Sequence, residues 1–346
     1  MIQLLRHPED VPPCGLRLKD LIRQEKWAVD FKEIKGQAHA KRALEIAAAG
    51  FHNVLMMGPP GAGKTMLARR MPTILPPLTF DEIIEVTRIH SSAGILRDGE
   101  PVVERPFRSP HHTVTAPGLI GGGIVPKPGE VSLAHRGVLF LDEVTEFRRG
   151  VLEGLRQPIE DGQVTVSRAA ISITYPSAFM LVAALNPCED VYSGIQGNVG
   201  VSPSIRRRYY SKLSGPMLDR IDIQIEVPKL EFKDIDTRED GEDSRAMRKR
   251  VVAARSLQRR RFGRLGKDIL FNSQMGTPEL KKFCRVKPDS RELLAAAVDR
   301  WGFSVRAYAR TLKVARTIAD LEGCVDITAA HVAEAIQYKV LDPMHP

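Results

Sequence analysis

The segment Gly58 to Thr65 reads Gly-Pro-Pro-Gly-Ala-Gly-Lys-Thr and constrains the fold of this chain more than any other feature. It fits the pattern G-x-x-x-x-G-K-[S/T] and follows Asn53 to Met57, a run typical of a short buried strand. A helix is expected to begin near Lys64. Strand, glycine-rich turn and helix in this order form the context in which the pattern cradles phosphates. The sequence therefore predicts an α/β fold with a phosphate-binding loop, or P-loop.

The residue types of the loop fit the chemistry of a nucleoside triphosphate. Gly61 and Gly63 let backbone N–H groups wrap the phosphates at a helix N-terminus, and Lys64 reaches the β- and γ-phosphates. The hydroxyl of Thr65 coordinates Mg²⁺. We therefore expect ATP and Mg²⁺ as ligands. The residues predicted to bind the nucleotide are Gly58, Pro59, Pro60, Gly61, Ala62, Gly63, Lys64, Thr65 and Met66.

Two further strands are predicted to end in polar groups. Val138 to Leu141 is an apolar run that ends in Asp142 and Glu143. Asp142 is the expected carboxylate ligand of Mg²⁺, and Glu143 suits a general base that orients the attacking water. Ala178 to Leu185 ends in Asn186, whose amide could hold the same water. The alternative interpretation is an ordinary strand-end turn.

Helices alternate with buried strands through the first two thirds of the chain, which indicates an α/β layered core with a mostly parallel sheet. An apolar stripe predicts a helix from Phe31 to Gly50, and Asp222 to Val227 is expected to form another strand. Alternation with period two in Gln163 to Ser167 and in Ile171 to Tyr175 predicts a hairpin that turns about Arg168.

The Gly and Pro content of residues 79–130 is too high for a plain helix or sheet, so we expect an irregular functional insertion there. After residue 240 the pattern becomes wholly helical. The expected helices are Ser244 to Arg261, Pro288 to Trp301, Ser304 to Glu322 and Thr328 to Val340. The predicted organisation is an N-terminal extension (1–30), an α/β core (31–240) with a hairpin at about 163–175, and an all-helical C-terminal domain (241–346).

Charge is distributed unevenly along the 346 residues. The formal net charge is +9, and residues 241–346 hold 21 Lys and Arg against 12 Asp and Glu. The segment Ser244 to Lys267 carries ten basic residues and no acidic residue. This charge is enough to attract a polyanion, although a solvated helix face is the alternative.

The composition also bears on location and on the thiols. The longest apolar run, Ala178 to Leu185, is far shorter than the roughly 18 residues that span a bilayer. The N-terminal residues lack the pattern of a signal peptide, so we expect a cytoplasmic protein with no membrane partner. The four cysteines form no C-x-x-C pair, which predicts reduced thiols rather than disulfides or a metal knuckle. They are Cys14, Cys188, Cys284 and Cys324.

Together these residues resemble the AAA+ superfamily and, more narrowly, the magnesium-chelatase-like ATPases of the ComM/YifB type. The resemblance extends from about Asp30 to the C-terminus and implies an AAA+ core followed by an all-α lid domain. Besides the P-loop, five strings carry it: Ile34 to Gln37, Arg108 to Thr113, Gly129 to Gly137, Leu155 to Gly162 and Ser214 to Asp222.

The resemblance implies a homo-oligomer, a hexameric ring with ATP bound between subunits. It makes Arg220 the arginine finger that is donated to the γ-phosphate of the neighbouring subunit. It makes Arg306 the sensor-2 arginine that reads the phosphates within its own subunit, with Arg310 one turn further on as the competing residue. It also places Gln37 near the adenine.

Two departures from the family pattern lead to further expectations. Members usually carry an N-terminal Lon-protease-like domain, whereas only about 30 residues precede the core here, so we expect that domain to be absent, lost or truncated. Members also commonly have a cysteine cluster after the Asn-Pro pair that corresponds to Asn186-Pro187. Here only Cys188 follows, so we expect no zinc at this position.

The ComM branch is associated with branch migration of recombination intermediates during natural transformation, so the resemblance implies an ATP-driven motor on branched or single-stranded DNA. Cations without base-reading partners would hold phosphates rather than sequence. The candidates are Arg105, Arg108, His111 and His112 in the insertion, Arg168 at the hairpin turn, and further Arg97 and Arg206 to Tyr210.

Other interpretations remain open at this point. The candidate DNA contacts would also serve to brace their own loops. A chelatase-type ATPase that remodels a metal-inserting protein partner is the alternative function. An ATP-binding module without hydrolysis is a third interpretation, and the presence of Glu143 and Arg220 argues against it.

Overall fold

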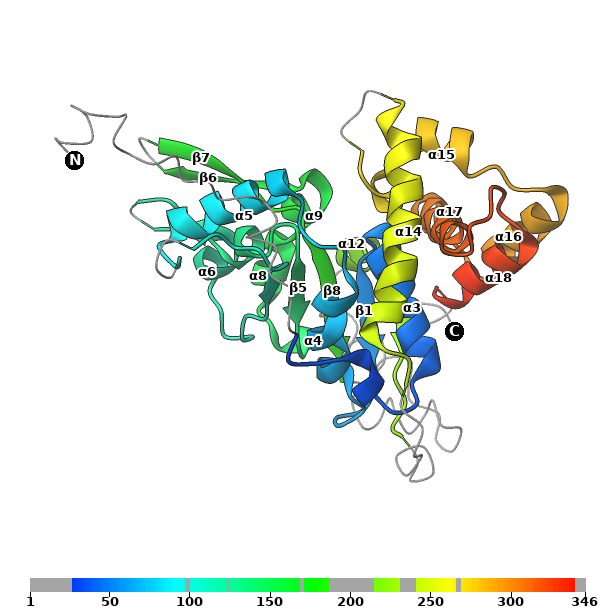
Figure 1. The fold of residues 1–346 in the computed structure, drawn as a ribbon, viewed down its shortest axis with the longest axis horizontal. Helices are drawn as coiled ribbons and strands as arrows, with labels where there is room; N and C mark the ends of the chain where they lie inside the picture. Colours follow the sequence, from blue (N-terminus) through cyan, green and yellow to red (C-terminus); the bar gives the residue numbers. More distant parts are fainter. Residues whose placement is uncertain are drawn as a thin grey trace, which may run out of the picture.

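The computed structural model describes residues 27–96, 100–123, 125–168, 171–186, 215–230, 241–265 and 269–339. A five-stranded sheet lies at its centre, with the strand order β2-β5-β8-β1-β9 (Figure 1). All neighbouring strands in this sheet are parallel. The strands are β1 (Val54–Met57), β2 (Phe107–Arg108), β5 (Val138–Leu141), β8 (Met180–Leu185) and β9 (Ile223–Glu226).

Both faces of the sheet are buried, which explains why its strands are apolar throughout. Successive side chains point to opposite faces, so Val54 and Met56 of β1 join one hydrophobic cluster and Leu55 and Met57 join another. Helices α3 (Ala38–Gly50) and α4 (Lys64–Ile74) cover the first face. The second is covered by α6 (Ala116–Ile120), α7 (Glu130–Leu133), η3 (Val144–Glu146), α8 (Arg149–Gly154), α9 (Arg156–Asp161) and α12 (Gly215–Leu218). The predicted α/β core is confirmed.

The first helix is shorter than the sequence predicts. Residues Phe31–Glu33 form the short 3-10 helix η2, and Gln37 has a φ of 53°. A left-handed residue cannot continue a right-handed helix, so α3 begins only at Ala38.

The expectation of an irregular segment over 79–130 is wrong for its first part. Phe80–Ala93 form the regular helix α5. Thr79 and Glu82 cap it reciprocally, with N–H to oxygen distances of 3.0 and 3.3 Å, and it ends at Gly94, whose φ is 73°. The Gly and Pro residues begin only after that point. Among them lie α6 and a short antiparallel pair, β3 (Gly121–Gly122) and β4 (Lys127–Pro128).

The predicted hairpin is confirmed. Strands β6 (Gln163–Arg168) and β7 (Ile171–Pro176) pair antiparallel and project from one end of the molecule (Figure 1). One face packs Val164, Val166 and Tyr175 into the core. The other face is exposed and carries two hydroxyl pairs, each at 2.9 Å, Thr165 with Thr174 and Ser167 with Ser172.

The region after residue 240 is helical, as expected. Its elements are α14 (Ser244–Gly263), η4 (Asn272–Gln274), α15 (Thr277–Phe283), α16 (Pro288–Trp301), α17 (Val305–Leu321) and α18 (Ala329–Gln337). Helix α15 was not predicted because its seven residues give too short a periodic pattern. In the part of the chain that the structure describes, no helix has both the length and the apolar character needed to cross a membrane.

Helix α14 fastens this lid region to the core. The guanidinium of Arg255 is buried, donates from Nε to the carbonyl oxygen of Ala48 at 2.9 Å, and lies 5.5 and 4.4 Å from the ring centres of Phe51 and Phe271. Gln258 donates to the carbonyl oxygen of Ala49 at 3.0 Å. One hydrophobic cluster continues from the sheet through α3 into the lid. The lid is therefore held against α3, and this packing decides which end of the sheet α17 reaches.

Candidate nucleotide site

The P-loop directly follows β1, at the edge of the sheet where the parallel strands have their carboxyl ends. Gly61 and Gly63 have φ values of 80° and 92°. A Cβ at either position would meet no atom within 4 Å, so it is the backbone conformation that requires glycine here. Gly58 is required for a different reason, because a Cβ there would collide with the carbonyl oxygen of Val227 at the end of β9.

Lys64 opens α4 and lies folded against the loop. Its Nζ donates to the carbonyl oxygens of Gly58 at 2.6 Å and of Pro59 at 2.8 Å, and the residue is only 5% exposed. Burial lowers the pKa of Lys64, while the nearby carboxylates of Asp142 and Glu143 act in the opposite direction. The ammonium group is thus held beside the open side of the glycine-rich turn, where a phosphate group would be neutralised.

Polar side chains from three adjacent strands meet beside the P-loop. The hydroxyl of Thr65 donates to Asp142 Oδ2 at 2.7 Å. The amide of Asn186 donates to Glu143 Oε1 at 3.2 Å. These residues follow β1, β5 and β8, which are neighbours in the sheet. A hydroxyl beside a carboxylate suits Mg²⁺, and a carboxylate held by an amide suits a water molecule, so these residues fit Mg²⁺ and ATP.

Glu143 adopts an unusual backbone conformation, with φ 48° and ψ 50°. This left-handed conformation costs a non-glycine residue on the order of 1 kcal/mol. Its backbone N–H donates to Asp142 Oδ1 at 3.0 Å, and its side chain reaches Asn186. The strained turn therefore separates the two carboxylates, so that Asp142 faces Thr65 and Glu143 faces Asn186.

Gln37 and Met66 lie at the margin of this site. Gln37 Nε2 donates to the carbonyl oxygen of Pro228 at 2.8 Å and of Ala62 at 3.5 Å, which joins the P-loop to the segment after β9. Met66 is 47% exposed on the first turn of α4. The contact of Gln37 with adenine stays a prediction.

Arg220 lies at the opposite edge of the sheet. It precedes β9, and its guanidinium pairs with Glu160 at the end of α9. It lines a cavity of about 460 Å³ together with residues that precede β1, β8 and β9, among them Asn53, Phe179 and Asp222. Because these positions mark the amino ends of parallel strands, Arg220 is far from the P-loop of its own chain.

Arg306 also lies at this amino edge, whereas the resemblance placed it beside the phosphates within its own subunit. Its Nη1 is 3.6 Å from Asp219 Oδ2, and its side chain is 67% exposed. Arg310, one turn further along α17, has Nε 3.7 Å from Asp222 Oδ1 and lines the same cavity as Arg220. The packing of α14 and α17 on α3 directs the start of α17 away from the P-loop, so Arg306 does not reach it in this structure.

A buried polar network at this edge escaped the sequence analysis. His52, at the turn between α3 and β1, lies 3.4 Å from Asp222 Oδ2 and 2.8 Å from the hydroxyl of Thr317 in α17. Burial by itself raises the pKa of Asp222, but the His52 hydrogen bond and the charges of Arg310 and Lys339 outweigh it and hold this pKa well below its usual range. The sequence offered little signal for it beyond a histidine in the short turn Phe51 to Asn53.

Arg105 does not fit its predicted contact with DNA. It is 6% exposed, and its guanidinium donates to the carbonyl oxygens of Pro76, Arg136 and Pro77 and to Glu82 Oε2 at 3.1 Å. The side chain therefore braces the insertion from inside, where phosphates cannot reach it.

The other DNA candidates differ from one another. Arg108 is neutralised by a two-point pair with Glu130, at 2.6 and 2.8 Å. The rings of His111 and His112 are in contact, with their centres 4.0 Å apart and their planes tilted by 35°, and His111 is exposed. The side chain of Arg168 lies outside the described residues, as do Arg97, Cys188 and residues 206–210.

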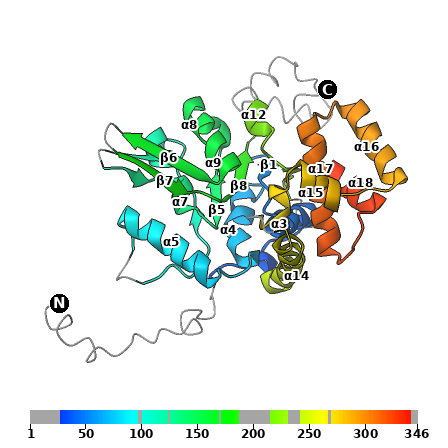
Figure 2. The same ribbon diagram turned by 90° about the horizontal axis from the view of Figure 1, so that it is seen from above.

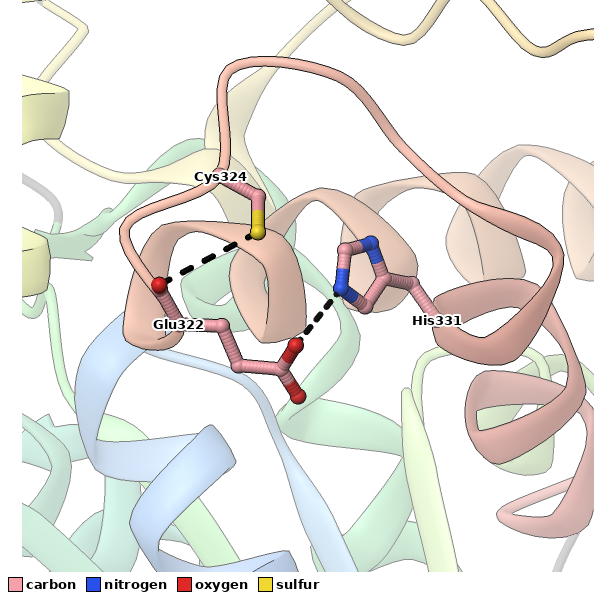
Figure 3. A group of neighbouring side chains, drawn as sticks. All are labelled: Glu322, Cys324 and His331. Atoms are coloured by element: carbon pink, nitrogen blue, oxygen red, sulfur yellow. Dashed lines mark hydrogen bonds and ion pairs between the residues drawn. The ribbon is translucent and has the colours of Figure 1, made fainter.

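A cluster of metal-ligand types lies in the lid, at the loop between α17 and α18 (Figure 3). His331 Nδ1 accepts the backbone N–H of Thr328 at 3.0 Å, so Nε2 carries the hydrogen that it donates to Glu322 Oε2 at 2.8 Å. Coordination by Nε2 would move this hydrogen to Nδ1, against that N–H group. With Cys324 Sγ turned to the carbonyl oxygen of Glu322, the cluster serves to cap α18.

A five-stranded parallel sheet with a P-loop at its carboxyl edge and a helical lid on one face defines the AAA+ class of P-loop proteins. Comparison with family profiles agrees with this geometry. Residues 30–235 match the family described as magnesium chelatase, subunit ChlI, and residues 241–339 match the C-terminal region of the same subunit. The chain belongs to this magnesium-chelatase-like family, whose membership implies an ATPase that uses ATP and Mg²⁺.

The chain is also similar to longer bacterial proteins. It is 45% identical to competence protein ComM of Haemophilus influenzae, over 99% of this chain and 66% of that protein. It is 44% identical to protein YifB of Salmonella typhimurium, over 90% of this chain and 61% of that protein. The magnesium-chelatase subunit ChlI of Euglena gracilis is 26% identical over 48% of this chain and 54% of that subunit. The chain thus spans about two thirds of the length of the ComM and YifB relatives.

Proposed function

We propose that this protein is an ATP-hydrolysing ring motor that acts on DNA, as a translocase or branch-migration helicase in recombination or natural transformation. The observation that carries the proposal is the separation of the two halves of the ATP site. The groups that suit ATP and Mg²⁺ lie at one edge of the sheet, and the arginines that suit transition-state charge lie at the other. A chain of this design completes its site only with a neighbouring copy, which favours a ring.

The proposed roles at the carboxyl edge are as follows. The P-loop with Lys64 binds the phosphates, and Thr65 and Asp142 hold Mg²⁺. Glu143 takes the proton of the attacking water. The amide of Asn186, which donates to Glu143 Oε1 at 3.2 Å, helps to orient that water. Mg²⁺, when bound, supplies charge neutralisation at the β- and γ-phosphates.

At the amino edge, Arg220 and Arg306 act on the ATP of the neighbouring subunit. Both lie at the edge of the sheet that is opposite the P-loop of their own chain. A planar guanidinium group matches the γ-phosphate oxygens. Glu160, the partner of Arg220, is 54% exposed at its side chain. A phosphate group would therefore replace an exposed carboxylate as the partner of Arg220, which is a low-cost exchange.

Three observations favour DNA over a protein substrate. The relative that aligns over 99% of this chain is named a competence protein, and competence is the uptake of DNA by cells. The positive charge of the chain is concentrated after residue 240. The hairpin β6–β7 offers a row of exposed hydroxyls that would contact backbone phosphates, and exposed His111 would add to it.

The test is the steady-state ATPase rate of the purified protein with and without a four-way DNA junction. The Lys64→Ala variant serves as the blank, because it lacks the ammonium group that neutralises the β- and γ-phosphates. Stimulation by DNA that decreases with salt is the expected result. Basal turnover that DNA leaves unchanged at low and moderate salt would refute the DNA motor.

The second candidate is a chelatase-type ATPase that remodels a metal-inserting protein partner. The family profile and the similarity to the Euglena gracilis subunit favour it. It predicts turnover that is indifferent to DNA and stimulated by a protein.

A further inference from the structure

We propose that the outer face of α14, together with a basic cavity at its carboxyl end, binds the phosphate backbone of nucleic acid. This inference rests on the proposed function, because that function makes DNA the expected polyanion. It concerns a surface of the lid, away from the hairpin, the insertion and the ATP site.

The cavity has a volume of about 620 Å³ and lies between the end of α14, the end of α15 and the loop between α17 and α18. Six basic and two acidic side chains line it. The arginines of the inner wall have hydrogen-bond partners within the chain. Arg261 donates to Asp320 Oδ2 at 2.8 Å, and Arg316 donates to Asp320 Oδ1 at 3.1 Å and to the carbonyl oxygen of Val325 at 2.6 Å.

The rim is different. Arg260, Arg264, Lys282 and Arg285 are exposed. In the described part of the chain no carboxylate lies within ion-pair distance of these four side chains. Asp326 is the one acidic residue among the exposed lining residues of the cavity. The rim therefore presents cations that are available to an anion.

The negative carboxyl ends of the neighbouring helices do not neutralise the excess of positive charge in the cavity. Helices α14, α15 and α17 all end at the cavity, and each carboxyl end carries about half a negative charge. Together they contribute about −1.5 charges, whereas the lining side chains carry a formal excess of four positive charges, from six basic and two acidic groups. A net positive potential remains after the helix dipoles are compensated.

The positive surface continues along α14. Its exposed residues recur at helical spacing and form one stripe, in which Arg245, Lys249, Arg259, Arg260 and Arg264 are basic. Figures 1 and 2 show α14 on the outside of the molecule, with α3 and α17 to one side of it. Arg250 and Arg255 point elsewhere, to Glu45 and to Ala48, so the stripe is distinct from the cations that fasten the helix.

The length of the stripe favours an extended polyanion over a small one. Arg245 and Arg264 are separated by about 28 Å along the helix axis at 1.5 Å per residue. Duplex DNA carries one phosphate per 3.4 Å along each strand, so about eight phosphates of one strand pass within this length. A free phosphate would use only the cavity. The stripe has no wide apolar face, since Val252 is its one large hydrophobic residue, so it does not suit a membrane surface.

The test compares variants of the full chain for binding to a fluorescein-labelled four-way junction, by anisotropy over a series of KCl concentrations. The variant R260A/R264A/R285A removes three rim charges. We expect its affinity to fall roughly ten- to a hundredfold at about 0.1 M salt, and the slope of log K against log[salt] to become shallower by about 2.7, which is 0.9 for each lost phosphate contact. Thermal unfolding midpoints check that each variant is folded.

Two matched variants complete the design. R88A/R148A/R291A removes the same charge from exposed positions outside α14 and the cavity lining, and we expect it to bind as the unmodified chain does. R260K/R264K/R285K keeps the charge, and we expect it to retain most of the affinity, because a phosphate contact requires only a cation.

The outcomes separate this inference from the proposed function. Unchanged affinity and salt slope in the triple alanine variant would overturn the inference, while DNA-stimulated ATP turnover would still support the motor. Loss of binding in that variant without any stimulation of turnover would support the surface and refute the motor. Binding to anionic vesicles or an acidic peptide but not to DNA would overturn the assignment to nucleic acid.

Discussion

The placement of Arg306 predicts how inactive subunits complement one another. In this structure Arg306 lies 3.6 Å from Asp219, at the amino edge of the sheet, while Lys64 lies at the carboxyl edge. One chain therefore cannot bring both residues to the same ATP. Lys64→Ala and Arg306→Ala should each be inactive alone, because each lacks one half of every site.

Mixing the two variants restores complete sites only if Arg306 acts on the neighbouring subunit. A site is complete when the chain with an intact Lys64 lies beside the chain with an intact Arg306. In a randomly mixed ring with equal amounts of the two variants, about one interface in four meets this condition, so turnover of about a quarter of the wild-type rate is expected for independent sites. Action within one subunit would give no complete site in any mixture.

The assay is the steady-state ATPase rate of the two variants after they are mixed and allowed to exchange subunits. Arg220→Ala replaces Arg306→Ala in a parallel mixture and should behave in the same way, because both arginines lie at the amino edge. The control mixes each variant with itself. Turnover of the mixture no higher than that of the single variants, although mixed rings form, would refute this reasoning.

Three further predictions follow from the site and the fold. Glu143→Gln should lower turnover by about 10²- to 10⁴-fold while fluorescent ATP still binds, because the amide keeps its contact with Asn186 but cannot accept a proton; unchanged turnover would remove Glu143 from the mechanism. Burial lowers the pKa of His135 to about 4 from 6.5, so the unfolded chain binds a proton that the folded chain cannot. Stability should therefore fall as the pH decreases from about 6.5 to 4, by on the order of 2 to 3 kcal/mol, and urea unfolding of His135→Gln should lack this slope. Arg105→Ala should destabilise the fold by about 3 kcal/mol, since it leaves the partly buried Glu82 without its cation and removes the donor to three backbone carbonyl oxygens, and a thermal midpoint equal to that of the unmodified chain would contradict the bracing role.

The P-loop and the strands around it were predictable because their determinants are local. A strand that is buried on both faces needs an uninterrupted apolar run, and β5 matches the predicted Val138 to Leu141. The polar residues after β5 and β8 were then expected to meet, since parallel neighbours end at the same edge. The contacts of Thr65 with Asp142 and of Asn186 with Glu143 agree with this expectation.

The sequence was less informative where the overall content of Gly and Pro and the helix-capping residues indicate different structures. The many breakers in 79–130 suggested an irregular segment, yet Thr79 and Glu82 form a capping box that starts a regular helix before the first glycine. Arg105 illustrates the same limit. An arginine among prolines is typical of an exposed loop, and only the carbonyl groups gathered around it reveal that it is buried.

The sequence by itself determined the chemistry at the carboxyl edge of the sheet, because that chemistry depends on residues adjacent to strands. The tertiary structure decided which edge Arg306 and Arg310 reach and which cations of α14 stay exposed. Both outcomes depend on how α14 and α17 pack against α3, through the buried contacts of Arg255 with Ala48 and of Thr317 with His52. Contacts between residues more than 200 positions apart leave no periodic signal in the chain, so only the folded arrangement shows them.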